Sequence, residues 1–399
     1  MLWGGQFVSE LGGQLAAFAL PAIAVVALGA TPLQVGALQA FEFAVVPLVA
    51  AFAGVAADRY PRRPLMVGAN VVRLLALASI PIAWFVHALV LAQFFAVAAV
   101  VAAASVFFDT AYAAFLPAVV GREQYHRGVA RMAMSSSVAE ALGASGGGAI
   151  VEAVGAPFAV VLNVVSFVVS TINLLRLRVN EPRVRAVGQT SVRREARAGY
   201  ELVARTPALR AVALCTATAY LGGAMATSVL TIYCYRTLHL SPGQFGLILG
   251  VANVGLAGAM LARKLSERFG ARRVLAGATL LSAAGKFVFL WSAAPIAAIF
   301  LGRVLLSFAG PISSTTTQAL QTSEVPDAML GRMNAAMRTI TWAALPIGSF
   351  AGGAIATVYG IPATIFFGAA ISTCAVGWLV ATPAMSRRSQ RTHVVLNAA

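Results

Sequence analysis

Hydrophobic residues along this 399-residue chain occur in long runs that short polar turns interrupt. An α-helix rises about 1.5 Å per residue, so ~20 apolar residues are enough to cross the hydrocarbon layer of a bilayer. Each run must be helical, because any other backbone would leave polar groups without partners in lipid. The pattern predicts twelve spans, at 3–29, 33–57, 65–86, 88–117, 132–154, 157–178, 208–234, 243–265, 273–293, 295–320, 333–357 and 361–382.

Two polar segments set the predicted domain boundaries. The segment 179–207 carries six arginines and three glutamates, which indicates a solvated cytoplasmic connector with a surface helix around 191–204. The segment 383–399 is a basic cytoplasmic tail. The remaining chain divides into an N-terminal bundle over 1–178 and a C-terminal bundle over 208–382, each with six spans.

Composition and charge fit a membrane protein. The chain is 59% hydrophobic and 11% charged, whereas soluble domains average about 25% charged residues. The net charge of +16 first suggests nucleic acid as a partner, but nearly all lysines and arginines lie in turns on one predicted side. Cytoplasmic turns carry this excess, so we expect the lipid bilayer as partner, no nucleic acid and both termini in the cytoplasm. The other side offers little more than Arg236.

Two charged turns of similar sequence lie about 209 residues apart, at Gly54–Arg63 and Arg263–Arg272. Asp58 in the first copy corresponds to Glu267 in the second. Further matches follow in the same order, at an offset that drifts from 210 to 205 residues. They pair Leu11–Gly13 with Leu221–Gly223, Thr31–Gly36 with Ser241–Gly246, Gly147–Ile150 with Gly352–Ile355, and Gly155 and Pro157 with Gly360 and Pro362. We therefore expect two six-helix bundles related by a pseudo-twofold axis.

The first charged turn resembles the turn between the second and third helices of the major facilitator superfamily, Gly-x-x-x-Asp-Arg-x-Gly-Arg-Arg, with Pro61 in place of the second glycine. The segments Gly5–Gly12, Phe108–Pro117 and Pro326–Ala335 are similar to the macrolide- and enterobactin-exporter branch. The resemblance implies an all-α integral membrane protein of that fold in the cell (inner) membrane. It also implies a monomeric drug:proton antiporter that moves a small molecule by alternating access.

Charged residues inside the predicted spans are the candidates for transport chemistry. A charge in the bilayer core is costly, and a buried carboxyl binds a proton more readily than an exposed one. The proton-coupling or substrate-binding candidates are Glu10, Glu42, Glu140, Lys286, Arg303 and Arg338. Glu10 and Glu42 lead, because the second half has Tyr220 and Ala252 at the matching positions; a polar pair that stabilises helix contact is the alternative.

Lys286 leaves three interpretations open. A lysine at the depth predicted for it needs a carboxylate partner across a cavity or an anionic group of the substrate, unless its span ends earlier than the hydropathy indicates. Aromatic residues of candidate cavity helices, such as Phe41 and Trp342, would line an apolar pocket or face lipid.

By resemblance, a second set of residues is assigned to gating, in which the two bundles are latched at the cytoplasmic side. This set is Asp58, Arg59 and Arg63, joined by Arg73 and Asp109. The alternative role for these residues is anchoring of the turn.

The sequence contains no convincing nucleotide-binding glycine loop, histidine pair for zinc, or serine–histidine–aspartate set. We therefore expect no enzyme, no cofactor and no metal. The sequence predicts a secondary active transporter that exports a small amphipathic drug, antibiotic or siderophore by proton antiport. The alternatives are an importer, uniporter or lysolipid transporter of the same fold, and a membrane sensor that does not transport.

Overall fold

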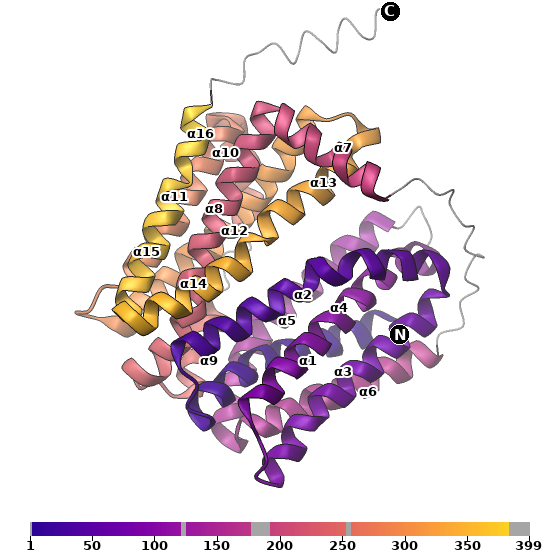
Figure 1. Ribbon diagram of the computed structural model, residues 1–399, viewed down its shortest axis with the longest axis vertical. Coiled ribbons are helices and arrows are strands. Elements are labelled where there is room, and N and C mark those ends of the chain that lie inside the picture. The colour runs from indigo at the N-terminus through magenta and orange to yellow at the C-terminus, as the bar shows by residue number, and fades with distance from the viewer. Residues whose placement is uncertain (1, 121–124, 177–191, 253–256, 383–399) are drawn as a thin grey trace, which may run out of the picture. The chain divides into compact units, whose positions relative to one another are not determined.

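The computed structural model describes residues 2–120, 125–176, 192–252 and 257–382 as helices joined by short turns (Figure 1). In the first half, each predicted span is one helix. These are α1 (Leu2–Ala22) with a π-helical turn η1 (Ile23–Ala27), α2 (Pro32–Arg59), α3 (Arg62–Phe85), α4 (Leu91–Val120), α5 (Tyr125–Val154) and α6 (Ala156–Arg176). The predicted surface helix of the connector is confirmed as α7 (Val192–Arg205), which packs against α13 (Figure 1). Residues 177–191 of the connector and the tail 383–399 lie outside the described residues.

The second half covers the other six predicted spans. Its helices are α8 (Pro207–Ile232) with a π-helical turn η2 (Tyr233–Thr237), α9 (Pro242–Ala252), α10 (Ala257–Phe269), α11 (Ala271–Val288), α12 (Pro295–Glu324), α13 (Asp327–Trp342), α14 (Ala344–Tyr359), α15 (Ile361–Cys374) and α16 (Val376–Ala381). The predicted spans 333–357 and 361–382 are each divided between two helices, and the span 243–265 contains α9 and α10, with residues 253–256 outside the described part of the chain. Among the described residues, nine helical segments are long and apolar enough to cross a membrane by themselves.

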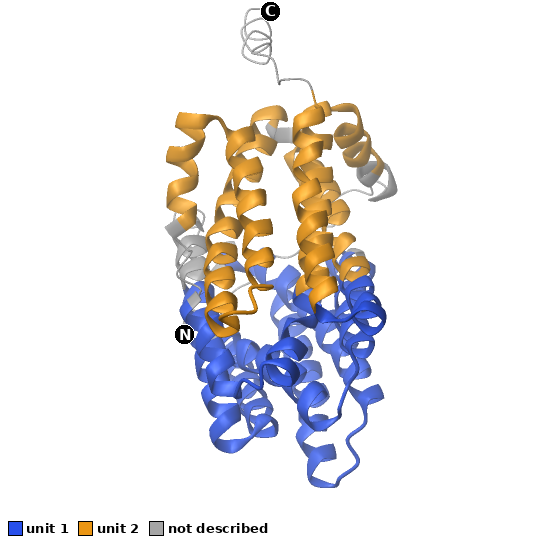
Figure 2. Ribbon diagram, turned by 90° about the vertical axis from the view of Figure 1, so that its left-hand side faces the viewer, with its two compact units in different colours: residues 1–188, 227–253, 349–361 blue, residues 189–226, 254–348, 362–399 orange. Residues whose placement is uncertain are grey.

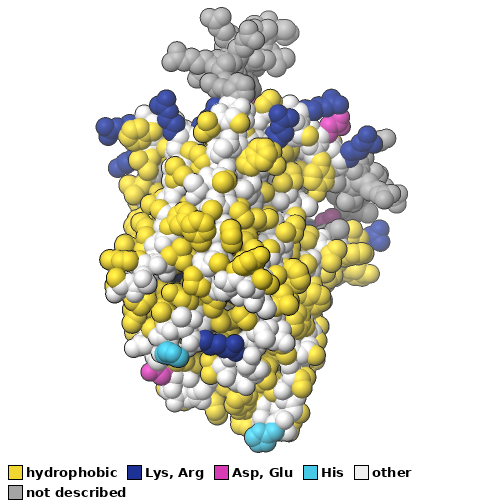
Figure 3. All heavy atoms as spheres, turned by 60° about the vertical axis from the view of Figure 1, so that its left-hand side comes forward, with side chains coloured by type: hydrophobic (Ala, Val, Ile, Leu, Met, Phe, Trp, Pro, Cys, Tyr) yellow, Lys and Arg dark blue, Asp and Glu magenta, His cyan; other side chains and the backbone are white. Residues whose placement is uncertain are grey.

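The chain forms two compact units (Figure 2). Unit 1 comprises residues 1–188, 227–253 and 349–361, and unit 2 comprises residues 189–226, 254–348 and 362–399. In unit 1, buried Met66, Phe108 and Leu174 join α3, α4 and α6. The buried cluster of unit 2 joins α7, α8, α11, α12, α13 and α16. On the face in Figure 3, lysine and arginine side chains gather at the end of unit 2 near α16, and hydrophobic side chains dominate beyond it.

The predicted repeat is confirmed in the local backbone. The π-helical turns η1 and η2 occupy matching positions, closed by the bonds from Leu28 N to Ile23 O at 3.1 Å and from Leu238 N to Tyr233 O at 3.0 Å. The fourth residue after each turn caps the next helix: the side chains of Thr31 and Ser241 each accept a hydrogen bond from the backbone N–H three residues later. Each half therefore folds its first two spans through the same sequence of local bonds.

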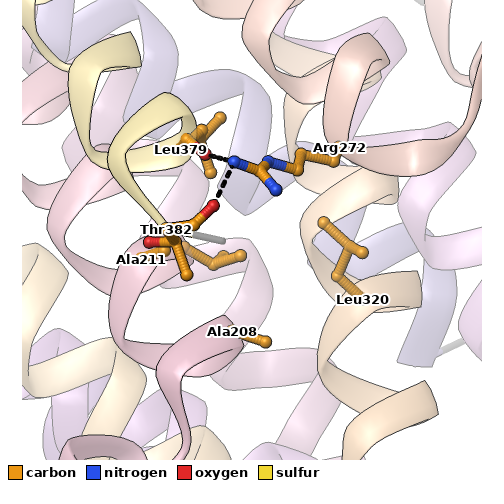
Figure 4. A pocket seen from close by; sticks show the side chains of 7 residues that line it. Ala208, Ala211, Arg272, Leu320, Leu379 and Thr382 are labelled. Carbon is orange, nitrogen blue, oxygen red and sulfur yellow. Dashed lines mark hydrogen bonds between the residues drawn. The ribbon is translucent and has the colours of Figure 1, made fainter. Parts of the chain in front are cut away.

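Arginines of the two charged turns make the same contact in both halves. Arg63 donates to the carbonyl of Leu174 at 2.7 Å and to that of Leu175, at the end of α6. Its counterpart Arg272 donates to carbonyls at the end of α16, including that of Thr382 at 2.6 Å (Figure 4). Helix ends leave carbonyls without helical partners, so a guanidinium there satisfies several acceptors at once. The small pocket between Arg272 and Leu320 has room for about one water molecule.

The side with these arginines is called the basic end of each half, and the opposite side the far end. Matching glycines pack the first and last helices of each half. A Cβ at Gly12 would lie 2.6 Å from the Cβ of Ser166 in α6, and one at Gly222 would lie 2.6 Å from the Oγ of Ser372 in α15. Glycine is required at both positions because no other residue lets the helices approach so closely.

Replacing Gly12 with alanine is therefore expected to destabilise the protein, whereas Gly13→Ala is its matched control. The added methyl at position 12 meets Ser166 and Asn163, and such overpacking costs about 1–3 kcal/mol. A Cβ at Gly13 meets nothing within 4 Å, and alanine there gains about 0.5–1 kcal/mol in helix propensity. The midpoint of thermal unfolding in detergent measures both effects. Equal midpoints for the two variants would contradict the packing described for α1 and α6.

Candidate functional site

Glu42 lies in α2 about 15 Å from the first residue of that helix, which is near the middle of a ~30 Å hydrocarbon layer. Its side chain is exposed, and within the described residues it makes no hydrogen bond or ion pair. Pro47 lacks an N–H, so the carbonyl of Phe43, one residue from Glu42, has no helical donor. A carboxylate exposed at this depth has to face water, because exposure to lipid is too costly.

Glu10 lies in α1 and belongs to a polar cluster within unit 1. Its Oε2 accepts a hydrogen bond from Ser136 of α5 at 2.9 Å, and its Oε1 accepts one from Gln6 at 3.2 Å. Its charge also acts on the phenol of Tyr112 in α4. Glu10 and Glu42 share no hydrogen-bond partner among the described residues. Glu10 therefore ties α1 to α5, which is compatible with a role in helix contact, in transport, or in both.

The other carboxylate and the arginines of the candidate set are spread over separate helices. Glu140 is exposed on α5, one turn after Ser136, and Arg303 is half-buried on α12. Arg338 is exposed on α13, where its guanidinium carbon lies 4.4 Å from the centre of the Trp342 ring. This pair stands at the junction of α13, which ends at Trp342, and α14, which begins at Ala344; Ala343 between them keeps helical dihedrals.

Lys286 is buried in unit 2 with only 2% of its surface exposed. Its Nζ donates to the Oγ of Ser372 at 2.9 Å and to the Oγ of Ser282 at 3.1 Å. Within the described residues no carboxylate pairs with it. The helix also ends earlier than predicted, at Val288 instead of 293, so Lys286 lies in the last turn of α11. There the partial negative charge of the helix C-terminus favours a cation, and the lysine ties α11 to α15.

The residues assigned to gating fall into two groups. Asp58 and Arg59 are exposed at the basic end of α2, and Arg63 anchors the end of α6 as described above. Arg73 is buried between the rings of Phe108 and Phe167, at 4.4 and 4.6 Å, and it donates to Asn70 and Ser105. Asp109 is the acidic residue whose charge acts on Arg73. The structure thus brings Arg73 and Asp109 together within the first half.

At the far end of unit 1, two pairs of helices cross in close contact at glycines, and these crossings were not predicted from the sequence. A Cβ at Gly36 in α2 would lie 2.8 Å from the Cα of Gly353 in α14, and one at Gly148 in α5 would lie 2.8 Å from the Cα of Gly246 in α9. The two crossings, called here the far-end seal, join first-half helices to second-half segments of the same unit. The signal was present, since all four glycines lie in segments that match between the halves.

Two charged residues close to the far-end seal also cross between the halves. Glu152 of α5 accepts hydrogen bonds from the Oγ of Ser241 at 2.9 Å and from the N–H of Gly243 at 2.7 Å, at the N-terminus of α9. Arg236 of η2 donates to the carbonyl of Val25 in η1 at 3.0 Å. A carboxylate at a helix N-terminus is favoured by the helix dipole. Sequence reasoning passed over Glu152 because it lies at the end of its span.

Comparison with known proteins agrees with this architecture. Residues 1–395 match the family model described as transmembrane secretion effector. No curated protein matches the sequence. Among solved structures, a variant of the nucleoside transporter NupG has a TM-score of 0.79 at 11% identity, covering 96% of this chain and 98% of that one.

Two bacterial structures in inward-facing states have the same fold. A homologue of the iron transporter ferroportin has a TM-score of 0.75 at 18% identity, covering 95% of this chain and 97% of its own. A homologue of the human lysosomal transporter Spinster has a TM-score of 0.71 at 14% identity, covering 98% and 97%. At these identities the likeness shows the fold alone. Together with the match over almost the whole length, it shows that the chain belongs to the transmembrane secretion effector family and is a membrane transporter of the major facilitator type.

Proposed function

We propose that this transporter exports a small amphipathic compound from the cell in exchange for protons. The observation that carries the proposal is Glu42, an exposed carboxylate without a protein partner near mid-membrane. Such a group has two ways to lower its free energy, which are to bind a proton or to contact water or a polar substrate. A site that holds either the proton or the substrate is the basis of antiport.

The exchange would then proceed through alternate opening of the two sides. With the far-end seal open, Glu42 takes a proton from the outside and becomes neutral, which lowers the cost of enclosing it. With the seal closed, water and substrate reach it from the basic end, the proton leaves to the cytoplasm, and substrate takes its place. The glycines of the seal support this cycle, because contacts between bare backbones separate and re-form without side-chain rearrangement.

The free energy needed to open the far end depends on the contacts of the far-end seal and on the hydrogen bonds of Glu152 and Arg236. Each of these two charged side chains forms a hydrogen bond between the halves at 3.0 Å or less. Opening the far end breaks these bonds and exposes both groups to water, at a net cost of about 1.5–3 kcal/mol for each bond to a charged group. The difference in affinity of a proton or a substrate for the two states has to supply this free energy.

Uptake into everted membrane vesicles tests the proposal. Vesicles with an acidic interior, with and without the protein, are given a panel of fluorescent anionic, neutral and cationic amphipathic dyes. We expect accumulation of at least one dye that stops when an uncoupler collapses the pH gradient. Accumulation that ignores the gradient would indicate a uniporter or importer, and binding without accumulation would indicate a sensor; either result removes the antiport proposal.

A further inference from the structure

The helix α13 presents two different faces. Its buried side, which includes Met333 and Met337, packs into the core of unit 2. Its exposed side is polar up to the middle of the span, with Asn334, Arg338 and Thr339. In the first two turns of α14, beyond Ala343, the exposed residues are apolar, Ile347 and Phe350. A polar stripe on a membrane-spanning helix faces a water-filled space, because lipid does not tolerate it.

Arg338 is the last charged residue of this stripe, and the protein does not neutralise it. A guanidinium has five N–H donors, yet within the described residues Arg338 donates no hydrogen bond and has no carboxylate in ion-pair range. Its contact is with the face of the Trp342 ring at 4.4 Å. The stacking holds the planar guanidinium in place beside the ring and leaves its N–H edge available.

A third feature lies at the same place. Pro346 has no N–H, so the carbonyl of Trp342 has no helical donor. Ala343, between α13 and α14, keeps helical dihedrals and donates to the carbonyl of Thr339 at 3.0 Å. The junction falls about 24 Å from each end of the α13–α14 span, at its midpoint. Backbone groups without a helical partner near the bilayer midplane are typical of substrate sites in transporters, because they are available to a ligand. A cation, an aromatic face and a bare carbonyl therefore meet within one helical turn.

We propose that Arg338 and Trp342 form a substrate subsite for an organic anion with a flat apolar body. The guanidinium binds the carboxylate or a similar group through two parallel N–H donors, and the indole ring packs against the flat body. The inference rests on the proposed function only in treating this face as part of the transport path. It deepens that function by naming an anionic, planar class of substrate.

Binding to the purified full-length protein tests the subsite without any pH gradient. The probes are three naphthalene compounds of similar size: 2-naphthoate (anion), 2-naphthamide (neutral) and 1-naphthylmethylamine (cation). Isothermal titration is expected to show that naphthoate binds at least about tenfold more tightly than the other two, as charge-assisted hydrogen bonds predict. Arg338→Gln is expected to abolish this preference and Arg338→Lys to keep part of it. Trp342→Leu is expected to weaken all three probes, and Arg332→Gln, on the same helix nearer the basic end, to leave the preference intact.

Three results would overturn the subsite: equal affinity of the wild-type protein for the three probes, an Arg338→Gln protein that keeps the preference, or no binding of any probe at millimolar concentration. If Arg338→Gln aggregates on size exclusion, the Arg338→Lys and Trp342→Leu proteins decide between the outcomes. If naphthoate binds but a pH gradient does not drive its transport, the antiport proposal is wrong and the subsite proposal is supported. If a pH gradient drives transport of cationic dyes alone, the antiport proposal is supported and the subsite proposal is wrong.

Discussion

A Glu42→Gln protein is expected to lose pH-driven accumulation of substrate, down to the level of vesicles without the protein. Glutamine keeps the size and polarity of the side chain but cannot gain or lose a proton, so the proton no longer has a carrier at mid-membrane. Exchange of labelled for unlabelled substrate should survive in this variant, because that exchange needs no net proton movement. The measurement is uptake by everted vesicles with an acidic interior, run beside a counterflow assay without a gradient.

Glu267→Gln is the matched control for this experiment. Glu267 is an exposed carboxylate near the basic end, paired with Arg263 at 2.9 Å within α10. It lies outside the path assigned to the proton, so uptake should keep its full dependence on the gradient. If uptake by the Glu42→Gln protein still depends fully on the pH gradient, Glu42 is not the proton carrier and another carboxylate must be. Glu10 is then the first candidate, because it already accepts two hydrogen bonds.

Replacing Gly148 with valine is expected to hold the far end open. The new side chain would collide with the backbone of α9 at Gly246, and overpacking of this kind costs about 1–3 kcal/mol, or a shift of about 5- to 150-fold in the equilibrium between closed and open seal. The transport rate should fall in proportion to the fraction of protein that can still close the seal. A cysteine placed at Ser241, after removal of Cys215, Cys234 and Cys374, should react faster with a membrane-impermeant thiol reagent from outside the cell.

Gly146→Val is the control for the seal, because it makes the same change on the same helix. A Cβ at Gly146 meets nothing within 4 Å, so neither transport nor the reactivity of the cysteine should change. The proposed role of Gly148 in closing the far end is wrong if both valine variants have the same transport rate and the same cysteine reactivity. It also fails if Gly148→Val slows transport with no change in labelling, since that result would point to general loss of folded protein.

Hydropathy was enough to predict the order of the spans, because long apolar runs in lipid have one backbone solution. It was insufficient where a helix ends without a polar residue. The run around Lys286 continues through Phe289 and Trp291, so the predicted span reached 293, whereas α11 stops at Val288 and those residues form a turn. The true end explains why this lysine finds hydroxyl partners near a helix terminus and needs no carboxylate.

The candidate site was predictable in its residue types but not in its contacts. Glu42 and Arg338 were found because charges are rare in apolar runs, and their exposure became visible only when the rotation of α2 and α13 was fixed by packing. The glycine crossings were missed for a different reason. A glycine has no side chain to carry a hydropathy signal, and the partner of Gly148 lies about a hundred residues away in the sequence, at Gly246.

The turns η1 and η2 also bear on the ancestry of the chain. A π-helical turn closes its hydrogen bond over five residues, so it ends the first helix of each half in a way that few helices do. The two turns stand 210 residues apart, although the residues differ at all five positions. One such helix end, present before a duplication, would account for both.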